Sequence, residues 1–357
     1  MPLIAYERKR PGPETAAVIR QVNTVLSEHA AEGYDLTLRQ LYYQFVAHDL
    51  FPDDRTWSWD EARKRWYRDP EGTKNADPNY KWLGSIVNDA RMGGRIDWHH
   101  IVDRTRNVRA HPHWDDPADV VASVAKQFRV DLWEDQPRYV EVWIEKDALV
   151  GVIAKAAGQY DVPYFSCRGY TSQSEMWSAA QRLLGKVTEG KAVTILHLGD
   201  HDPSGIDMTR DIEDRLSLFL GTDWALSQGC DHTTSQANLK ATVNQAMDKF
   251  EVRRIALNRD QVDQYDPPPN PAKMTDSRFA GYLAEHGDQS WELDALPPKV
   301  LAELVTDELG TLIEWDAWEA ADARQVEGRE LLSKASERWA ELAAQLDDGN
   351  GDGQAMV

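Results

Sequence analysis

The spacing of hydrophobic residues divides the chain into a helical N-terminal part and a following part in which strands and helices alternate. Apolar residues recur every three or four positions in segments 13–31, 38–50 and 79–92, which predicts three amphipathic helices. Short apolar runs typical of buried strands follow at 139–144, 163–167, 192–199 and 252–257. Helical patterns separate or follow them at 148–158, 173–186, 204–219 and 235–249. This alternation predicts an α/β domain with a parallel, Rossmann-like sheet and right-handed crossovers.

The N-terminal pattern predicts a winged helix-turn-helix domain. Helices 38–50 and 79–92 precede the segment RIDWHHI at 95–101, which we interpret as a short strand. The polar stretch 51–78 predicts a long loop with at most a short helix at 59–67. If the domain binds DNA, basic and polar residues on and after its second helix contact the groove or the phosphates. The candidates are Lys81, Ser85, Asn88, Arg91, Arg95, Arg104 and Arg106, with a solvated helix face as the alternative.

Two adjacent tyrosines on helix 38–50 have different predicted environments. Tyr42 belongs to the apolar stripe of the helix, so we expect it in the core. Tyr43 points roughly 130° away from the centre of that stripe at 100° per residue, which predicts an exposed phenol. Arg39 lies one turn earlier on the same face, where its charge would favour the phenolate and hold a phosphate oxygen. Tyr43 is therefore a candidate nucleophile, and an ordinary surface Tyr–Arg pair is the alternative.

Carboxylates follow two of the predicted strands. Strand 192–199 ends in Gly199 and the sequence Asp-His-Asp-Pro-Ser-Gly, which supplies Asp200 and Asp202, and Glu145 follows strand 139–144. Because ligands of parallel sheets bind at the carboxyl ends of strands, we expect the three acids to converge around Mg²⁺. Arg168, after strand 163–167, is a candidate phosphate contact at the same edge. The alternative is that the two aspartates only form a turn and cap the next helix.

Composition is compatible with a cytoplasmic protein of two or three domains. The chain has 357 residues, 41% of them hydrophobic, and no apolar run approaches the ~20 residues of a membrane span. It has no apolar signal core, and its two cysteines give neither a disulfide framework nor zinc spacing. The net charge of −20 is uneven: eighteen acidic and five basic residues follow position 280, whereas 55–109 is slightly basic. The net charge therefore does not exclude DNA as a partner.

The Arg-x-x-Tyr-Tyr sequence at 39–43, the Glu145 strand and the Asp-x-Asp-Pro-x-Gly turn occur in an order that resembles the A subunit of topoisomerase VI. The related meiotic double-strand-break transesterase shares this order of motifs. The resemblance runs from about residue 35 to 313 and includes WELDAL at 291–296, similar to a Glu-x-Glu-Ala-Leu-like element. It implies a winged-helix domain, a metal-binding TOPRIM domain and a nucleoid-associated type IIB enzyme that cleaves DNA.

In that family the second tyrosine, here Tyr43, becomes linked to a DNA 5′ end. Mg²⁺ is held by the positions matching Glu145, Asp200 and Asp202, with Glu145 as ligand or general acid/base. The resemblance also implies a homodimer, in which tyrosine and metal site come from different subunits, and a separate ATPase B subunit. The expected division is an N-terminal arm at 1–33, a winged-helix domain at 34–136, a TOPRIM domain at 137–314 and an acidic helix with a disordered tail at 315–357.

Two other functions remain open from the sequence. A TOPRIM nuclease would use water as the attacking group, and Tyr43 would then only contact DNA. A DNA-binding or partner subunit would have no catalytic activity. The chain has no Walker-type glycine loop, so it would either pair with a separate ATPase or break DNA without controlled strand passage. The C-terminal helix predicted at 315–346 has no counterpart in the resemblance.

Overall fold

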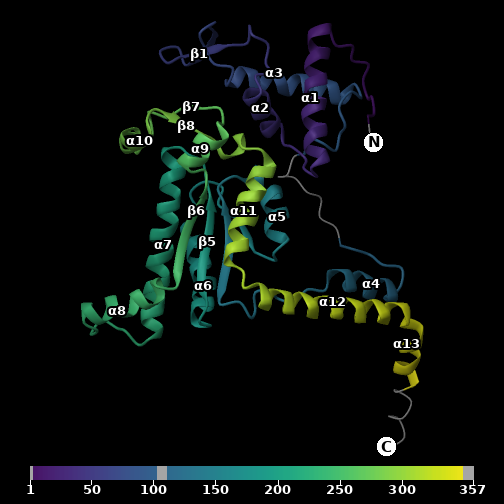
Figure 1. The fold of residues 1–357 in the computed structure, drawn as a ribbon, viewed down its shortest axis with the longest axis vertical. Helices are drawn as coiled ribbons and strands as arrows, with labels where there is room; N and C mark the ends of the chain where they lie inside the picture. The colour runs from purple at the N-terminus through teal and green to yellow at the C-terminus, as the bar shows by residue number, and fades with distance from the viewer. Residues whose placement is uncertain (1–2, 103–110, 349–357) are drawn as a thin grey trace, which may run out of the picture. The chain divides into compact units, whose positions relative to one another are not determined.

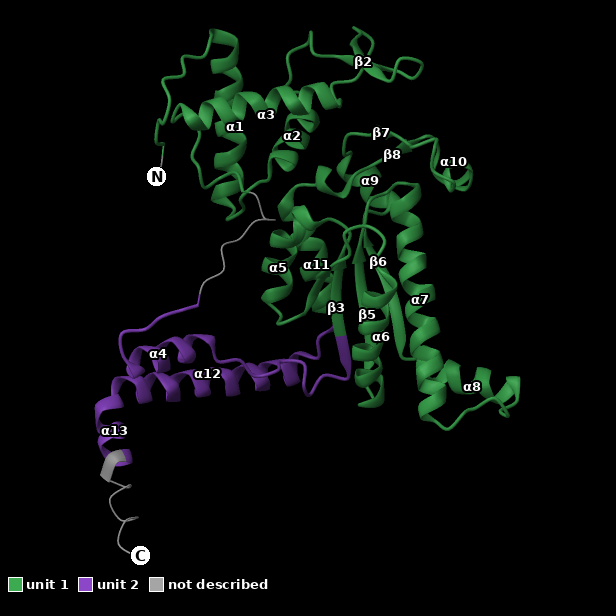
Figure 2. Ribbon diagram, turned by 180° about the vertical axis from the view of Figure 1, so that it is seen from behind, with its two compact units in different colours: residues 1–106, 140–311 green, residues 107–139, 312–357 purple. Residues whose placement is uncertain are grey.

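The computed structural model describes residues 3–102 and 111–348 of the chain (Figure 1). It contains two compact units, coloured separately in Figure 2. The larger unit comprises residues 1–106 and 140–311, and the smaller one comprises residues 107–139 and 312–357. The predicted mixed α/β class with a parallel sheet is confirmed.

Three helices form the N-terminal core of the larger unit: α1 (Pro13–Ala31), α2 (Leu38–Ala47) and α3 (Asp77–Met92). Their apolar faces meet in one cluster that includes the fully buried Val22, Leu41, Phe45 and Leu83. Helix α1, the predicted N-terminal arm, supplies one side of this core. Helix α2 begins at Thr37, whose hydroxyl accepts a hydrogen bond from the Gln40 amide in a capping box.

Between α2 and α3 the chain forms a β-hairpin, β1 (Trp57–Asp60) and β2 (Arg65–Arg68). The prediction of a short helix at 59–67 is therefore wrong. The sequences WSWD and RWYR alternate with the two-residue period of strands, and the EARK segment between them forms the turn. Trp59 and Trp66 are directly opposite each other across the hairpin.

The strand predicted at 95–101 is not present in the described part of the chain. There, Ile101 forms only an isolated bridge with Leu36. Apolar residues of this segment, Ile96 and Ile101, instead fill the helical core. The described residues after α3 therefore contain no strand that could serve as a wing.

The rest of the larger unit is built on a four-stranded parallel sheet with the order β4-β3-β5-β6. Its strands are β3 (Arg138–Ile144), β4 (Tyr164–Ser166), β5 (Ala192–Leu198) and β6 (Phe250–Ala256). The accompanying helices are α5 (Val150–Gly158), α6 (Gln173–Thr188), α7 (Pro203–Ser227), α8 (Gln236–Met247) and α11 (Pro298–Leu312). The predicted strands and helices are present, with shifted ends. Because β3 and β5 are adjacent central strands, the residues after them lie side by side.

The segment after β6 contains regular elements on both sides of a run of prolines. Residues 258–273 hold α9 (Arg259–Tyr265) and β7 (Asn270–Pro271). A capping box between Asn258 and Gln261 starts α9 ahead of the prolines at 267–269. Helix α10 (Phe279–His286) and β8 (Gln289–Ser290) follow, and β8 pairs with β7.

The smaller unit pairs α4 (Pro117–Gln127) with the long helix α12 (Trp315–Glu337) (Figure 2). The helix predicted at 315–346 is interrupted near Arg338, and α13 (Trp339–Asp348) follows. The tail predicted to be disordered comprises residues 347–357; its first two residues belong to α13, and 349–357 lie outside the described residues. Among the described residues, no helix combines the length and apolar character needed to cross a bilayer.

His197 of β5 makes the larger unit sensitive to acid. Its ring is fully buried with Nδ1 2.8 Å from the Thr209 hydroxyl, and burial together with nearby Arg254 lowers its pKa from 6.5 to about 3. The unfolded chain binds a proton here below about pH 6.5, whereas the folded chain stays neutral, so stability falls as the pH drops from that value toward 3.

We predict that His197 alone makes the free energy of unfolding about 2 kcal/mol lower at pH 5 than at pH 7, at about 1.4 kcal/mol per pH unit. Denaturant unfolding at both pH values measures it. His197→Gln should remove this contribution, and His232→Gln, at an exposed position, should not. Equal pH dependence in wild type and His197→Gln would contradict the prediction.

Candidate active site at the carboxyl edge of the sheet

Glu145 and Asp200 meet at the carboxyl ends of β3 and β5. The backbone amide of Glu145 donates to the Leu198 carbonyl at 2.9 Å, which extends the pairing of the two strands. The amide of Asp200 donates to Glu145 Oε2 at 2.9 Å. The predicted convergence of these two acids is therefore observed, and it follows from the adjacency of their strands.

Asp202 lies near Glu145, as predicted, since its charge adds to the effect of burial in raising the pKa of Glu145, but Asp202 also has a structural role. Its Oδ1 accepts hydrogen bonds from the Ser204 hydroxyl at 2.9 Å and from the Gly205 amide at 2.6 Å. Asp202 thus caps α7, as in the alternative interpretation of the Asp-x-Asp sequence. It still lines the pocket described below, but its capping oxygen is already engaged.

The turn after β5 is held by a buried arginine. The Arg254 guanidinium donates to the carbonyls of Gly199 at 2.9 Å, Asp200 at 2.6 Å and Gly205 at 2.9 Å. Burial is the main cause that lowers its pKa to about 10, and nearby Glu145 and Asp200 oppose that shift. Arg254 therefore stays charged near neutral pH and fixes the backbone that presents Asp200.

A group of carboxylates that could hold a metal ion is formed by Asp200, Glu292 and Asp294. One oxygen from each lies within 4.8 Å of the others. The Leu293 amide donates to Asp200 Oδ1 at 2.7 Å, so this bond attaches the 292–294 segment to the turn after β5. The sequence predicted Glu145 and Asp202 as the partners of Asp200. The signal for the observed set was the pair of acids two positions apart in WELDAL.

Lys146 and Arg39 balance the charge of this acidic cluster. Lys146 Nζ lies 2.9 Å from Asp200 Oδ2 and 2.9 Å from Asp294 Oδ1, and it also contacts Glu292. Arg39 places Nη2 2.8 Å from Glu292 Oε2 and Nε 2.8 Å from Asp294 Oδ2. The sequence reasoning missed Lys146, which directly follows the predicted glutamate. Its position after the end of β3 was the available signal.

The acids of the site differ in how readily they hold a proton. Burial raises the pKa of Asp200 well above its usual value, against the effect of Lys146, and burial also raises the pKa of Glu145. Burial acts in the same direction on Glu292, but Lys146 and Arg39 outweigh it and hold the pKa of Glu292 below its usual value. The site thus has a carboxyl that retains its proton more readily beside one that stays ionised.

Tyr43 is buried, contrary to the prediction of an exposed phenol. Its side chain is 3% exposed and packs edge-on against Tyr42 at 5.3 Å between ring centroids. Arg39 Nη2 donates to Tyr43 Oη at 3.3 Å, so the predicted pairing of these two residues is observed. Burial, together with Glu292 and Asp294, nevertheless raises the pKa of Tyr43 to about 12. Arg39 lowers the pKa of Tyr43, as predicted, but burial and the two carboxylates outweigh this effect, so the phenol keeps its proton near neutral pH. Tyr42 is buried, as predicted.

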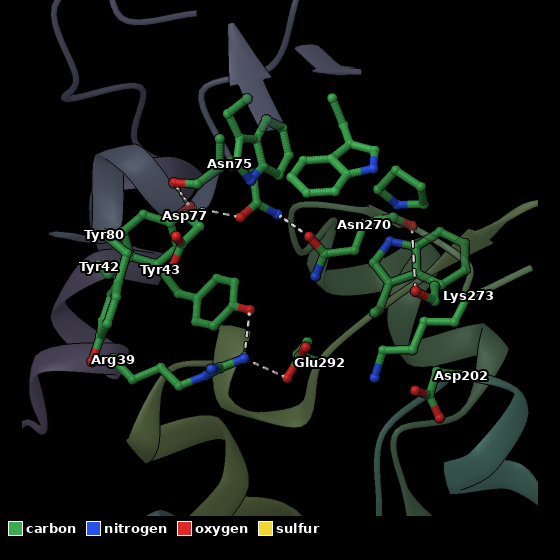
Figure 3. A pocket seen from close by; sticks show the side chains of 16 residues that line it. Arg39, Tyr42, Tyr43, Asn75, Asp77, Tyr80, Asp202, Asn270, Lys273 and Glu292 are labelled. Carbon is green, nitrogen blue, oxygen red and sulfur yellow. Dashed lines mark hydrogen bonds and ion pairs between the residues drawn. The ribbon is translucent and has the colours of Figure 1, made fainter. Parts of the chain in front are cut away.

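A pocket of about 390 Å³ connects Tyr43 with the carboxylates, and we call it the Tyr43 pocket. Figure 3 shows the Tyr43 hydroxyl directed toward Arg39, which reaches Glu292. The lining residues are Arg39, Tyr42, Tyr43, Trp59, Trp66, Asn75, Ala76, Asp77, Tyr80, Asp202, Asn270, Pro271, Lys273, Ser290, Trp291 and Glu292. A tyrosine, an arginine and ionisable carboxylates therefore face the same space.

Three of the predicted DNA contacts on α3 are exposed. Lys81, Ser85 and Asn88 lie on the solvent side of the helix, and Lys81 forms an ion pair with Asp77 at 2.7 Å. Arg95 is also exposed. These side chains can be reached by a ligand, although their exposure does not distinguish a binding face from an ordinary helix surface.

Arg91 and Arg168, two further predicted DNA contacts, have different environments. The Arg91 guanidinium donates to the carbonyls of Trp98 at 2.9 Å and Ile101 at 3.2 Å, so it is used to hold its own loop. Arg168 is exposed and forms an ion pair with Asp147 at 3.2 Å. Arg104 and Arg106 lie outside the described residues.

Comparison of the chain with protein-family models, curated proteins and solved structures gives no match. The interpretation of the site therefore depends on its residues, distances and charges.

Gly205 is required where α7 begins. A Cβ at this position would lie 2.2 Å from the Asp200 carbonyl oxygen and 3.0 Å from the Asp200 nitrogen. We predict that Gly205→Ala displaces the turn and lowers the free energy of unfolding by about 1–3 kcal/mol. Gly185→Ala on α6, where a Cβ meets nothing within 4 Å, should instead raise it by about 0.5–1 kcal/mol. Urea unfolding measures both, and equal effects would contradict the prediction.

The ligand set can be tested by Mn²⁺ binding, measured by titration calorimetry. We predict that Asp294→Asn weakens binding by at least about tenfold, because it removes one of the three clustered carboxylates. Asp202→Asn should leave the affinity unchanged, since asparagine still caps the helix. The reverse pattern, with binding lost only in Asp202→Asn, would support the set predicted from the sequence.

Proposed function

We propose that this protein is a Mg²⁺-dependent enzyme that breaks DNA strands by tyrosine transesterification, as the A subunit of a type IIB topoisomerase does. The observation that carries the proposal is the Tyr43–Arg39–Glu292 chain of contacts. Arg39 Nη2 lies 3.3 Å from Tyr43 Oη and 2.8 Å from Glu292 Oε2, and all three line one pocket. A phosphodiester in that pocket would meet a nucleophile, a cation for its oxygens and carboxylates together.

The reaction exchanges one phosphoester for another. Tyr43 Oη attacks phosphorus, a bond between phosphorus and the tyrosine oxygen forms, and the bond to the 3′ oxygen breaks. Arg39 stabilises the charge on the non-bridging oxygens, and Glu292, held ionised, accepts the phenol proton. Glu145, whose pKa is raised by burial, can supply a proton to the departing 3′ oxygen. A divalent cation held by Asp200, Glu292 and Asp294 would contribute electrostatic stabilisation of the transition state.

The architecture is compatible with the domain assignments of this proposal. A parallel sheet with a glutamate after one central strand and an aspartate after its neighbour is compatible with a TOPRIM domain at 137–314. The helical core with α2 and α3 would be the DNA-binding domain, although the described residues contain no wing after α3. We further propose DNA and a separate ATPase B subunit as partners, and association with the nucleoid.

The pocket differs from what the resemblance implies in which subunit supplies the tyrosine. Tyr43 and Glu292 of the same chain line one pocket, which favours attack by a tyrosine on a phosphate held by its own subunit. A homodimer would then bring two complete sites to the two strands of a duplex. The resemblance instead places the tyrosine of one subunit at the metal site of the other.

A second candidate is a hydrolytic nuclease that uses the same carboxylates. It is favoured by the burial of Tyr43, which is 3% exposed, and by its pKa of about 12, since both disfavour a phenolate near neutral pH. Water would then attack the phosphodiester, and Tyr43 would orient Arg39. A DNA-binding subunit without catalytic activity is the third candidate, and it predicts no cleavage.

Incubation with supercoiled plasmid and Mg²⁺, stopped with detergent and analysed with and without protease, separates the candidates. We predict breaks that carry protein at the 5′ end. Tyr43→Phe should abolish them, because it removes the attacking oxygen. Tyr42→Phe is the matched control and should retain them, since the Tyr42 hydroxyl donates to Asn75 at 2.9 Å and is not aimed at Arg39.

Asp200→Asn should also abolish cleavage. Protein-free breaks that survive Tyr43→Phe but not Asp200→Asn would overturn the transesterase and support hydrolysis. No cleavage by the wild type, alone or with a candidate ATPase subunit, would contradict both enzymatic candidates.

A further inference from the structure

The β1–β2 hairpin carries basic and aromatic residues in an otherwise acidic protein. Between Trp57 and Arg68 there are four basic residues and two acidic ones, while the chain as a whole has a net charge of −20. The same twelve positions hold three tryptophans and one tyrosine. A basic surface interleaved with aromatic side chains is typical of sites that bind single-stranded nucleic acid.

Two of these tryptophans form one wall of the Tyr43 pocket. Trp59 and Trp66 are cross-strand partners with ring centroids 5.5 Å apart and an angle of 64° between their planes. Both line the pocket, and Trp59 is 45% exposed. Large aromatic surface at a pocket is therefore left available for a ligand, in the same space that Tyr43 and Glu292 line.

Polar groups lie between the tryptophans and the tyrosine. Asn75 Nδ2 donates to Asn270 Oδ1 at 2.7 Å, and the Tyr42 hydroxyl donates to Asn75 Oδ1 at 2.9 Å. Figure 3 shows Asn75 and Asn270 facing each other along the pocket, with Lys273 on the side of Asp202. Asn75 also donates to the Pro269 carbonyl at 3.2 Å, so both of its N–H groups are used and it holds Asn270 in place. The Asn270 Nδ2 can donate to the edge of a base, and a lysine offers a positive charge to a phosphate.

We propose that the Trp59–Trp66 pair binds an unpaired base, so that the substrate of this site is single-stranded DNA. The inference rests on the proposed function, because it places the phosphate beside the stacked base at Arg39 and Tyr43. The faces of a base are accessible to tryptophan only when the base is unpaired and unstacked from its neighbours. A duplex would have to open locally before its strand could enter the pocket.

The composition of the pocket favours this ligand over others. Its volume of about 390 Å³ falls in the range of small-ligand sites and is too small to enclose a duplex. The positive charge of the hairpin favours a polyanion, and the exposed ring of Trp59 favours a π-surface over an aliphatic chain. Stacking is tolerant of sequence because every base has a π-face, so we expect little preference among bases.

The test is binding of a fluorescein-labelled twelve-nucleotide oligothymidylate, followed by anisotropy in EDTA so that no cleavage occurs. We expect the wild type to bind this strand at least about tenfold more tightly than a blunt duplex of equal length. Trp59→Ala should weaken single-strand binding at least about tenfold, because stacking on one base contributes about that much. Trp59→Phe keeps an aromatic ring and should restore most of the affinity.

Trp177→Ala is the matched control, since Trp177 is an equally exposed tryptophan on α6 and does not line the pocket. It should bind like the wild type. Tighter binding of the duplex, or single-strand binding that is unchanged in Trp59→Ala, would overturn the inference. Because this readout requires neither metal nor cleavage, it can succeed while the proposed enzymatic function fails. Conversely, covalent cleavage accompanied by unchanged binding in Trp59→Ala would leave the function intact and reject the stacking site.

Discussion

The compensation of buried negative charge by Lys146 and Arg39 is the interaction on which the site depends. Asp200, Glu292 and Asp294 hold oxygens within 4.8 Å of one another, and such a group repels itself strongly in a poorly solvated position. Lys146 contacts all three acids, and Arg39 contacts two of them. A cation bound by the three carboxylates would have to share them with, or displace, the Lys146 ammonium. Occupancy of the site and the position of Lys146 are therefore coupled.

The same charges join the helical core to the sheet. Arg39 belongs to α2, whereas Asp294 lies in the turn before α11, and Ala295 from that turn is buried in the core of the N-terminal helices. The Leu293 amide in turn bonds to Asp200. One short segment thus connects the tyrosine helix to the end of β5. The position of Tyr43 relative to the carboxylates is consequently a property of packing within the larger unit, and not of a flexible linker.

The Tyr43 pocket brings together chemistry and recognition from three distant parts of the chain. The hairpin supplies tryptophans, α2 supplies Tyr43 and Arg39, and the segment around β8 supplies Glu292. Burial is the main cause that raises the pKa of Tyr43 to about 12. In the proposed transesterification, the same burial would limit the access of water to the phosphotyrosyl bond. A bound strand that brings a phosphate and its counter-ions into the pocket changes the electrostatic environment of the phenol. We therefore expect the pKa of Tyr43 to differ between the free protein and the complex.

The sequence by itself determined the alternation of strands and helices, because apolar periodicity is local. It also determined the order of the acids along the chain and the meeting of Glu145 with Asp200, because the carboxyl ends of neighbouring parallel strands share one edge of the sheet. It also placed Arg39 beside Tyr43, since residues four apart share a helix face. It did not determine that Asp202 caps α7, that Tyr43 is buried, or that residues 57–68 form a hairpin. Only the tertiary structure brought Lys146, Glu292 and Asp294 to Asp200. These contacts with Asp200 join residues 54 to 94 positions apart, arise from packing, and are not encoded by a local pattern of charge or hydrophobicity.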